Sequence, residues 1–115
     1  MYDEHQQLDD ELAGLARSLR TGEHMLALLQ LAGFALKLDH SIRREERVLA
    51  LAYPAHTTLL AKLRAEHASL RRLVGLVVAA IDRSDDRRAL EVIQKLRSVL
   101  LLHLVKEERL DQLQA

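Results

Sequence analysis

A chain of 115 residues can bury one hydrophobic core, so we expect a single domain over residues 1–115. Its 17 basic and 17 acidic side chains cancel, which disfavours a surface for nucleic acid or for a membrane. The absence of cysteine excludes disulfides and thiolate metal sites, and we see no signal peptide or apolar segment long enough to cross a bilayer. We therefore expect a cytoplasmic protein.

The first predicted element is a helix over about residues 3–19. Apolar residues recur there at helical spacing, and the sequence Arg20-Thr21-Gly22 interrupts the pattern. Thr21 is expected to cap the second helix. The inward stripe of the first helix consists of His5, Leu8, Leu12, Leu15 and Leu19.

The second predicted helix ends near residue 52, because Pro54 disfavours a helical conformation in the residue before it. Its stripe contains two polar residues, Ser41 and Glu45, among apolar ones. A buried carboxylate is costly unless a cation or a donor compensates its charge. The inward positions are Phe34, Leu38, Ser41, Glu45 and Val48.

The third helix should begin at residue 57 or 58, and the fourth should follow a polar turn in which Ser84 or Asp85 acts as the cap and run to about residue 113. Four helices with short connections predict an all-α, antiparallel up-down-up-down four-helix bundle. The inward positions of the third helix are Leu60, Leu63, His67, Leu70, Val74 and Ile81. Those of the fourth are Leu96, Leu100, His103, Glu107 and Leu110.

Polar inward residues of all four helices are expected at one depth of the bundle. Counted from the turns along helices that rise about 1.5 Å per residue, His5, Ser41, His67 and His103 fall within about one turn of each other. Imidazole and carboxylate side chains gathered in this way could hold a metal ion, whereas a single core histidine would be unremarkable. Glu46 should lie on a solvated face or act as an outer partner of such a site.

An internal repeat with an offset of 62 residues supports this grouping. Glu4-His5 corresponds to Glu66-His67, and Glu45-Glu46-Arg47 corresponds to Glu107-Glu108-Arg109. The chain therefore reads as two helical hairpins, each with a histidine in its first helix and a glutamate in its second. The repeat places the counterpart of His103 at position 41, which is serine.

With these motifs in order, nearly the whole chain resembles the hemerythrin-like HHE cation-binding family. The matching segments are residues 4–8, 42–49, 66–71 and 103–108. The resemblance implies a four-helix bundle with a non-haem di-iron centre, in which Glu45 and Glu107 would bridge. The metal ligands that it implies are His5, Glu45, His67, His103 and Glu107.

The second helix departs from the family pattern, because Ser41 stands where the family has a histidine. In one interpretation, a π-bulge between His40 and Glu45 turns His40 inward as a substitute ligand. In the other, which we favour, the ligand is lost and the site is weakened or empty. The regular stripe through Leu38, Ser41 and Glu45 needs no bulge.

The leading hypothesis is a protein that binds iron, as one or two ions, with a small diatomic ligand such as O₂ or NO, or that senses or stores iron. Another divalent metal, such as manganese or zinc, is an alternative. The rival hypothesis is a metal-free bundle that serves as an interaction or homodimerisation domain. An enzyme is less favoured, because nothing indicates a substrate pocket or a second catalytic group.

Overall fold

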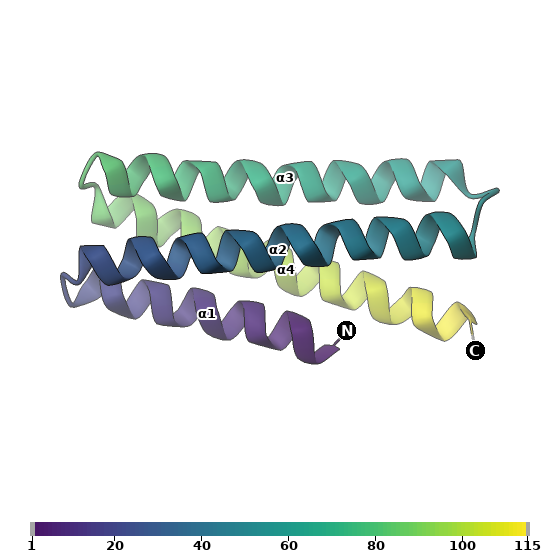
Figure 1. Ribbon diagram of the computed structural model, residues 1–115, viewed down its shortest axis with the longest axis horizontal. Helices are drawn as coiled ribbons and strands as arrows, with labels where there is room; N and C mark the ends of the chain where they lie inside the picture. The colour runs from purple at the N-terminus through teal and green to yellow at the C-terminus, as the bar shows by residue number, and fades with distance from the viewer. Residues whose placement is uncertain (1, 115) are drawn as a thin grey trace.

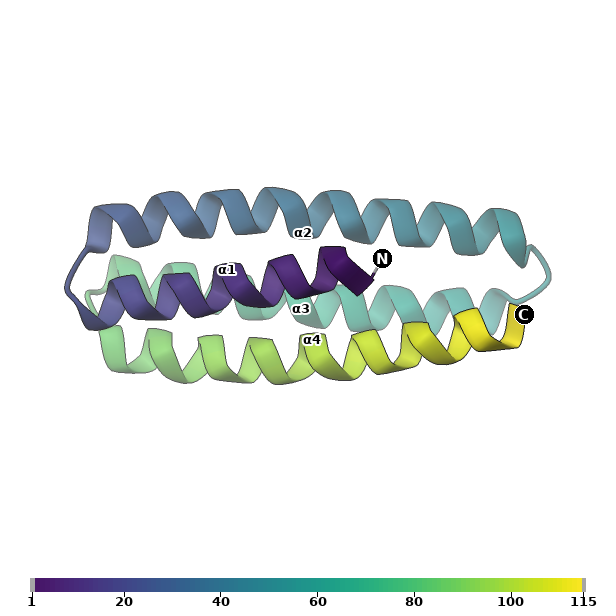
Figure 2. The same ribbon diagram turned by 90° about the horizontal axis from the view of Figure 1, so that it is seen from below.

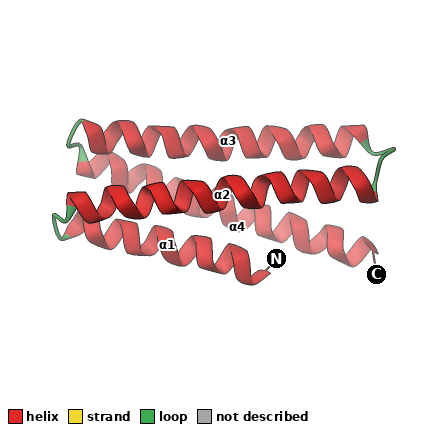
Figure 3. Cartoon of the chain, viewed as in Figure 1, coloured by secondary structure: helices red, strands yellow, loops and turns green. Residues whose placement is uncertain are grey.

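The computed structural model describes the backbone of residues 2–114 and the side chains of residues 6–103. These residues form four helices and, within the described range, no strand (Figures 1 and 3). The helices are α1 (Tyr2–Arg20), α2 (His24–Ala52), α3 (Thr57–Asp82) and α4 (Asp86–Gln114). Consecutive helices run in opposite directions, so the predicted all-α up-down-up-down bundle is confirmed.

Each helix packs against two neighbours around one core. Helix α1 contacts α2 and α4, and α3 contacts the same two helices from the other side. Phe34 and the inward leucines of all four helices fill the interior, which is where their helical spacing places them. Helix α1 is the shortest, and its N-terminal end lies part-way along the bundle, whereas α2, α3 and α4 continue beyond it (Figure 2).

The two turns at one end of the bundle show the internal repeat in three dimensions. Gly22 and its counterpart Ser84 both have a positive φ, of 76° and 57°. In each turn, the next residue donates its N–H to a carbonyl five residues earlier, from Glu23 to Ser18 and from Asp85 to Ala80. This is the usual C-terminal cap of a helix that ends in a left-handed residue.

Most predicted helix boundaries agree with the structure within one or two residues, but two local expectations are wrong. Thr21 does not cap α2: its hydroxyl donates back to the last carbonyls of α1, and Glu23 precedes the first residue of α2. Val48 is 48% exposed, because the inward stripe continues from Glu45 to Leu49, four residues on. Asp85 does cap α4 and accepts the N–H of Arg88 at 3.1 Å.

By length and composition alone, helix α2 is long and apolar enough to cross a membrane, contrary to the expectation that the chain has no such segment. Core helices of soluble proteins meet the same criteria. In the bundle, the inward side chains of α2 pack against α1 and α3.

Candidate metal centre

Glu45 is the inward carboxylate of α2. The stripe of Leu38, Ser41, Glu45 and Leu49 carries it into the bundle, where its side chain is 6% exposed. A carboxylate this deeply buried needs nearby donors or a cation, because removing its charge from water is expensive. Its neighbours therefore determine what the site can hold.

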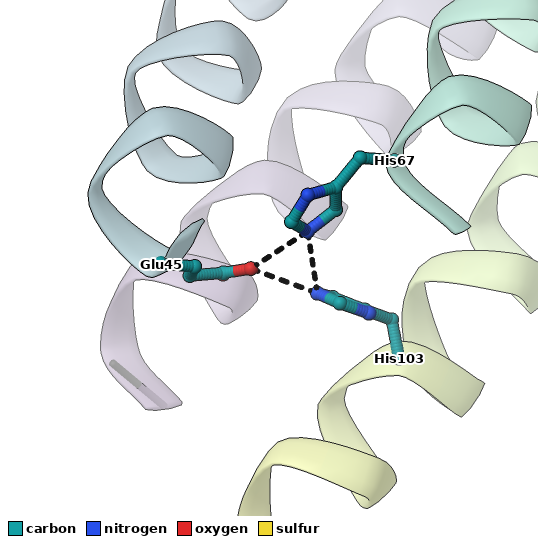
Figure 4. Close-up of side chains that lie close together, drawn as sticks. All are labelled: Glu45, His67 and His103. Atoms are coloured by element: carbon teal, nitrogen blue, oxygen red, sulfur yellow. Dashed lines mark hydrogen bonds and ion pairs between the residues drawn. The ribbon is translucent and has the colours of Figure 1, made fainter. Parts of the chain in front are cut away.

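Two histidines from two other helices meet Glu45. His67 of α3 is fully buried, and His103 of α4 is almost so. Their Nε2 atoms lie 3.0 and 2.9 Å from the same oxygen, Oε2 of Glu45, and 3.4 Å from each other (Figure 4). Three helices thus direct one nitrogen or oxygen atom each to a common point.

The outer nitrogen of each imidazole faces a second carboxylate. Nδ1 of His67 lies 3.0 Å from Glu46, and Nδ1 of His103 lies 3.1 Å from Glu66. An ionised carboxylate only accepts hydrogen bonds, so a hydrogen on each Nδ1 satisfies these two outer contacts. In the neutral tautomer with that hydrogen, the Nε2 lone pair points inward, toward Oε2 of Glu45.

This arrangement fits a metal ion. Three lone pairs that converge within 3.4 Å repel one another unless a proton or a cation lies between them. Donors about 2.1 Å from one ion are separated by roughly 3.0 to 3.4 Å, for octahedral or tetrahedral angles respectively. The observed separations of 2.9, 3.0 and 3.4 Å lie within about 0.1 Å of that range.

The donor set also restricts the kind of metal. Two imidazoles and one carboxylate on one side of an ion are typical of non-haem iron(II) sites that retain open positions. Glu45, Glu46 and Glu66 place three carboxylates around the two imidazoles. Carboxylate and imidazole donors together suit a divalent or trivalent cation.

The structure brings three of the six predicted site residues together: Glu45, His67 and His103. His40 is not among them. It is exposed on α2 and lines a shallow surface pocket with Gln7 and Lys37. The remaining two, His5 and Glu107, belong to α1 and α4, but their side chains lie outside the described part of the chain.

Position 41 explains why His40 points away. Helix α2 is regular α-helix from residue 24 to residue 52, so no π-bulge turns His40 inward, and one residue on a helix rotates a side chain by about 100°. Ser41 takes the inward position and is buried. Its hydroxyl donates to Oε1 of Glu45 at 3.3 Å, on the opposite side of the carboxylate from the histidines.

The sequence left two alternatives for Glu46, a solvated face or an outer partner, and the structure shows the second; Glu66 was missed. The pair Glu66-His67 served only in the repeat with Glu4-His5 and in the family pattern. The missed signal is that Glu66 neighbours an inward histidine, and Glu46 likewise neighbours the inward Glu45. A glutamate next in sequence to an inward ligand lies about 100° around the helix from it. Its carboxylate then faces the adjacent helix and can reach a ligand there.

Comparison with known families agrees with this geometry. The sequence matches the family described as the hemerythrin HHE cation binding domain over residues 1–112. The chain belongs to this family. No curated protein and no solved structure matches it. Membership in the hemerythrin HHE family implies that the domain binds a cation, and the group of Glu45, His67 and His103 is the candidate site in the described residues.

Proposed function

We propose that this hemerythrin HHE domain binds a single non-haem iron ion through Glu45, His67 and His103. The observation that carries the proposal is the convergence of Oε2 of Glu45 and Nε2 of both histidines on one point, with each outer nitrogen facing a carboxylate. When bound, iron would supply redox chemistry and open positions for a small ligand such as O₂ or NO. His5 and Glu107 are further candidate ligands, by family resemblance.

The protein's own residues would set the properties of that ion. Glu46 and Glu66 hold the two rings in the tautomer that ligates metal, and they make the imidazoles better donors. Ser41 hydrogen-bonds the far oxygen of Glu45 and supplies no imidazole. We therefore assign the domain a mononuclear or asymmetric centre and a role in binding or sensing iron, oxygen or redox state.

The test is metal analysis of protein produced in iron-rich medium, for the wild type and for two ligand variants, His103→Ala and Glu45→Gln. The proposal predicts about one iron per chain in the wild type and strong loss in both variants. His40→Ala and His24→Ala are matched controls, because both histidines are exposed and lie outside the group. These controls should retain the wild-type iron content.

A wild-type protein that binds neither iron, manganese nor zinc would refute the proposal. That result would favour the rival hypothesis, in which the bundle serves only as an interaction domain. Loss of iron in His40→Ala, with retention in His103→Ala, would show that a different set of residues binds the metal.

A further inference from the structure

The outward side of the first half of α2 is apolar, whereas the outward sides of helices in a water-soluble bundle are ordinarily polar. Met25, Leu29 and Leu36 are 74%, 66% and 75% exposed. With the exposed Ala32 they follow i, i+4, i+7 and i+11 spacing, and so form one stripe on the side of the helix away from the core. We call Met25, Leu29, Ala32 and Leu36 the α2 stripe; Leu26 and Leu28 widen it.

The internal repeat provides a control for this stripe. Helix α4 begins 62 residues after α2 and follows a turn with the same hydrogen bonds. Its residues at the equivalent positions are all polar and exposed. The bundle therefore accepts polar side chains at these positions, and its core does not require the apolar ones. The equivalents of Met25, Leu29, Ala32 and Leu36 are Arg87, Glu91, Gln94 and Ser98.

Gly33, beside Ala32, also lacks an explanation within one chain. A Cβ added there would meet no atom within 4 Å, and Gly33 does not have a positive φ. Glycine in a helix interior is unfavourable relative to alanine, so the fold of the single chain gains nothing from it. Ala32 in the stripe and Gly33 beside it are both small, which would let a second helix approach closely.

We propose that the α2 stripe is the interface of a homodimer, in which it packs against the same stripe of a second copy. The exposed fractions of its large apolar side chains and of Leu26 and Leu28 amount to about three whole side chains, on the order of 500 Å². A stable interface buries on the order of 800 Å² per partner, with an apolar centre and a polar rim. The stripe would supply the apolar centre of such an interface, and the polar residues around it would supply the rim.

A second copy fits this surface better than an anionic membrane does. The charged side chains nearest the C-terminal end of the stripe are already paired within the chain, Lys37 with Glu11 and Asp39 with Arg43. Paired charges make a neutral rim rather than the basic one that anionic lipid attracts. A twofold interface brings identical patches together, and an uncharged apolar stripe is complementary to itself.

Sedimentation equilibrium of the full chain tests the proposal directly. The wild type should sediment as a dimer of the 13.1 kDa chain at micromolar concentration. The double variant Leu29→Glu/Leu36→Ser gives each position the residue of its α4 equivalent and should raise the dimer dissociation constant at least about 100-fold. Leu102→Glu is the control, because Leu102 is 63% exposed on α4 and should leave the dimer intact.

A single introduced thiol locates the contact. The chain has no cysteine, so Ala32→Cys carries one thiol in the middle of the stripe, and Gln94→Cys carries one at the equivalent position of α4. With a mild oxidant, Ala32→Cys should form disulfide-linked dimers much faster than Gln94→Cys. Equal rates would overturn the assignment of the interface to α2.

Circular dichroism should show that each variant remains helical. A wild type that is monomeric at about 100 μM would overturn the proposal, because that concentration lies well above the dissociation constants of stable homodimers. So would a double variant that dimerises like the wild type. A monomeric wild type that co-sediments with phosphatidylcholine/phosphatidylserine vesicles, in a manner lost in the double variant, would assign the stripe to a membrane surface instead.

Discussion

Replacing Glu46 or Glu66 by glutamine should weaken metal binding without removing a ligand. Glutamine keeps the shape of the side chain, and its amide oxygen can still accept the hydrogen from the histidine Nδ1. It lacks the negative charge that holds His67 or His103 in place and increases the basicity of the inner nitrogen. The effect should therefore appear in affinity and not in the helix content.

The expected size follows from the two contacts of 3.0 and 3.1 Å. Loss of one outer partner of a metal ligand typically lowers metal affinity about 10–100-fold, or about 1.4–2.7 kcal/mol. Glu46 and Glu66 act on different imidazoles, so their effects should multiply. The affinity of the double variant for the metal is then expected to fall by a factor of about 10²–10⁴.

Anaerobic competition between the protein and a chromophoric iron(II) chelator measures this affinity. The matched control is Glu91→Gln, which also removes one negative charge but lies in an exposed ion pair with Arg87 and Arg88. It should bind iron(II) like the wild type. If Glu46→Gln and Glu66→Gln both bind within about threefold of the control, the two carboxylates do not orient the ligands, and this part of the account is wrong.

Three further predictions concern the same chain. Iron(II) at about 100 times its dissociation constant should stabilise the protein by about 2.7 kcal/mol and raise the Tm by about 10 °C in a thermal scan. An equal shift in His103→Ala would contradict the site. Ser41→His should raise bound iron from about one ion per chain toward two by metal analysis, whereas Ser41→Ala should not; no difference between them would refute a lost ligand at position 41. Arg97→Ala should reduce the free energy of unfolding by about 1 kcal/mol or less in urea titrations. The hydrogen bond to Asp9 raises the pKa of Arg97, but both side chains of this ion pair are about one-third exposed, so water screens it. A loss above about 2 kcal/mol would contradict this prediction.

The sequence predicted the fold well because helical periodicity and turn residues are local signals. Pro54 and Asp85 set helix boundaries through their own backbone or side-chain chemistry, and both expectations hold. The prediction for Thr21 was wrong because a hydroxyl near a helix end can bond to either neighbouring helix. Here Gly22 adopts a positive φ that ends α1, and the Thr21 hydroxyl donates to the last carbonyls of that helix. The prediction for Val48 was wrong because spacings of three and of four residues both fall on one helix face, and it is Leu49, four residues after Glu45, that packs in the core.

The site was predicted only in part, for a physical reason. The inward direction of Glu45, His67 and His103 follows from helix periodicity, and their common depth follows from helix length. Which side chain bonds to which ring depends on the rotation of each helix about its axis. That rotation is a property of the packed bundle, so Glu66 could not be assigned to His103 from the sequence. The apolar residues of the α2 stripe can be read from the sequence, but whether they are exposed depends on how all four helices are arranged.

The most direct measurement of the central claim is the position of the metal in a crystal of iron-loaded protein, located by anomalous scattering at the iron edge. The account predicts a peak about 2.0–2.3 Å from Nε2 of His67, Nε2 of His103 and Oε2 of Glu45. A peak at His40, or the absence of any peak beside these three atoms in crystals soaked with saturating iron(II), would contradict it.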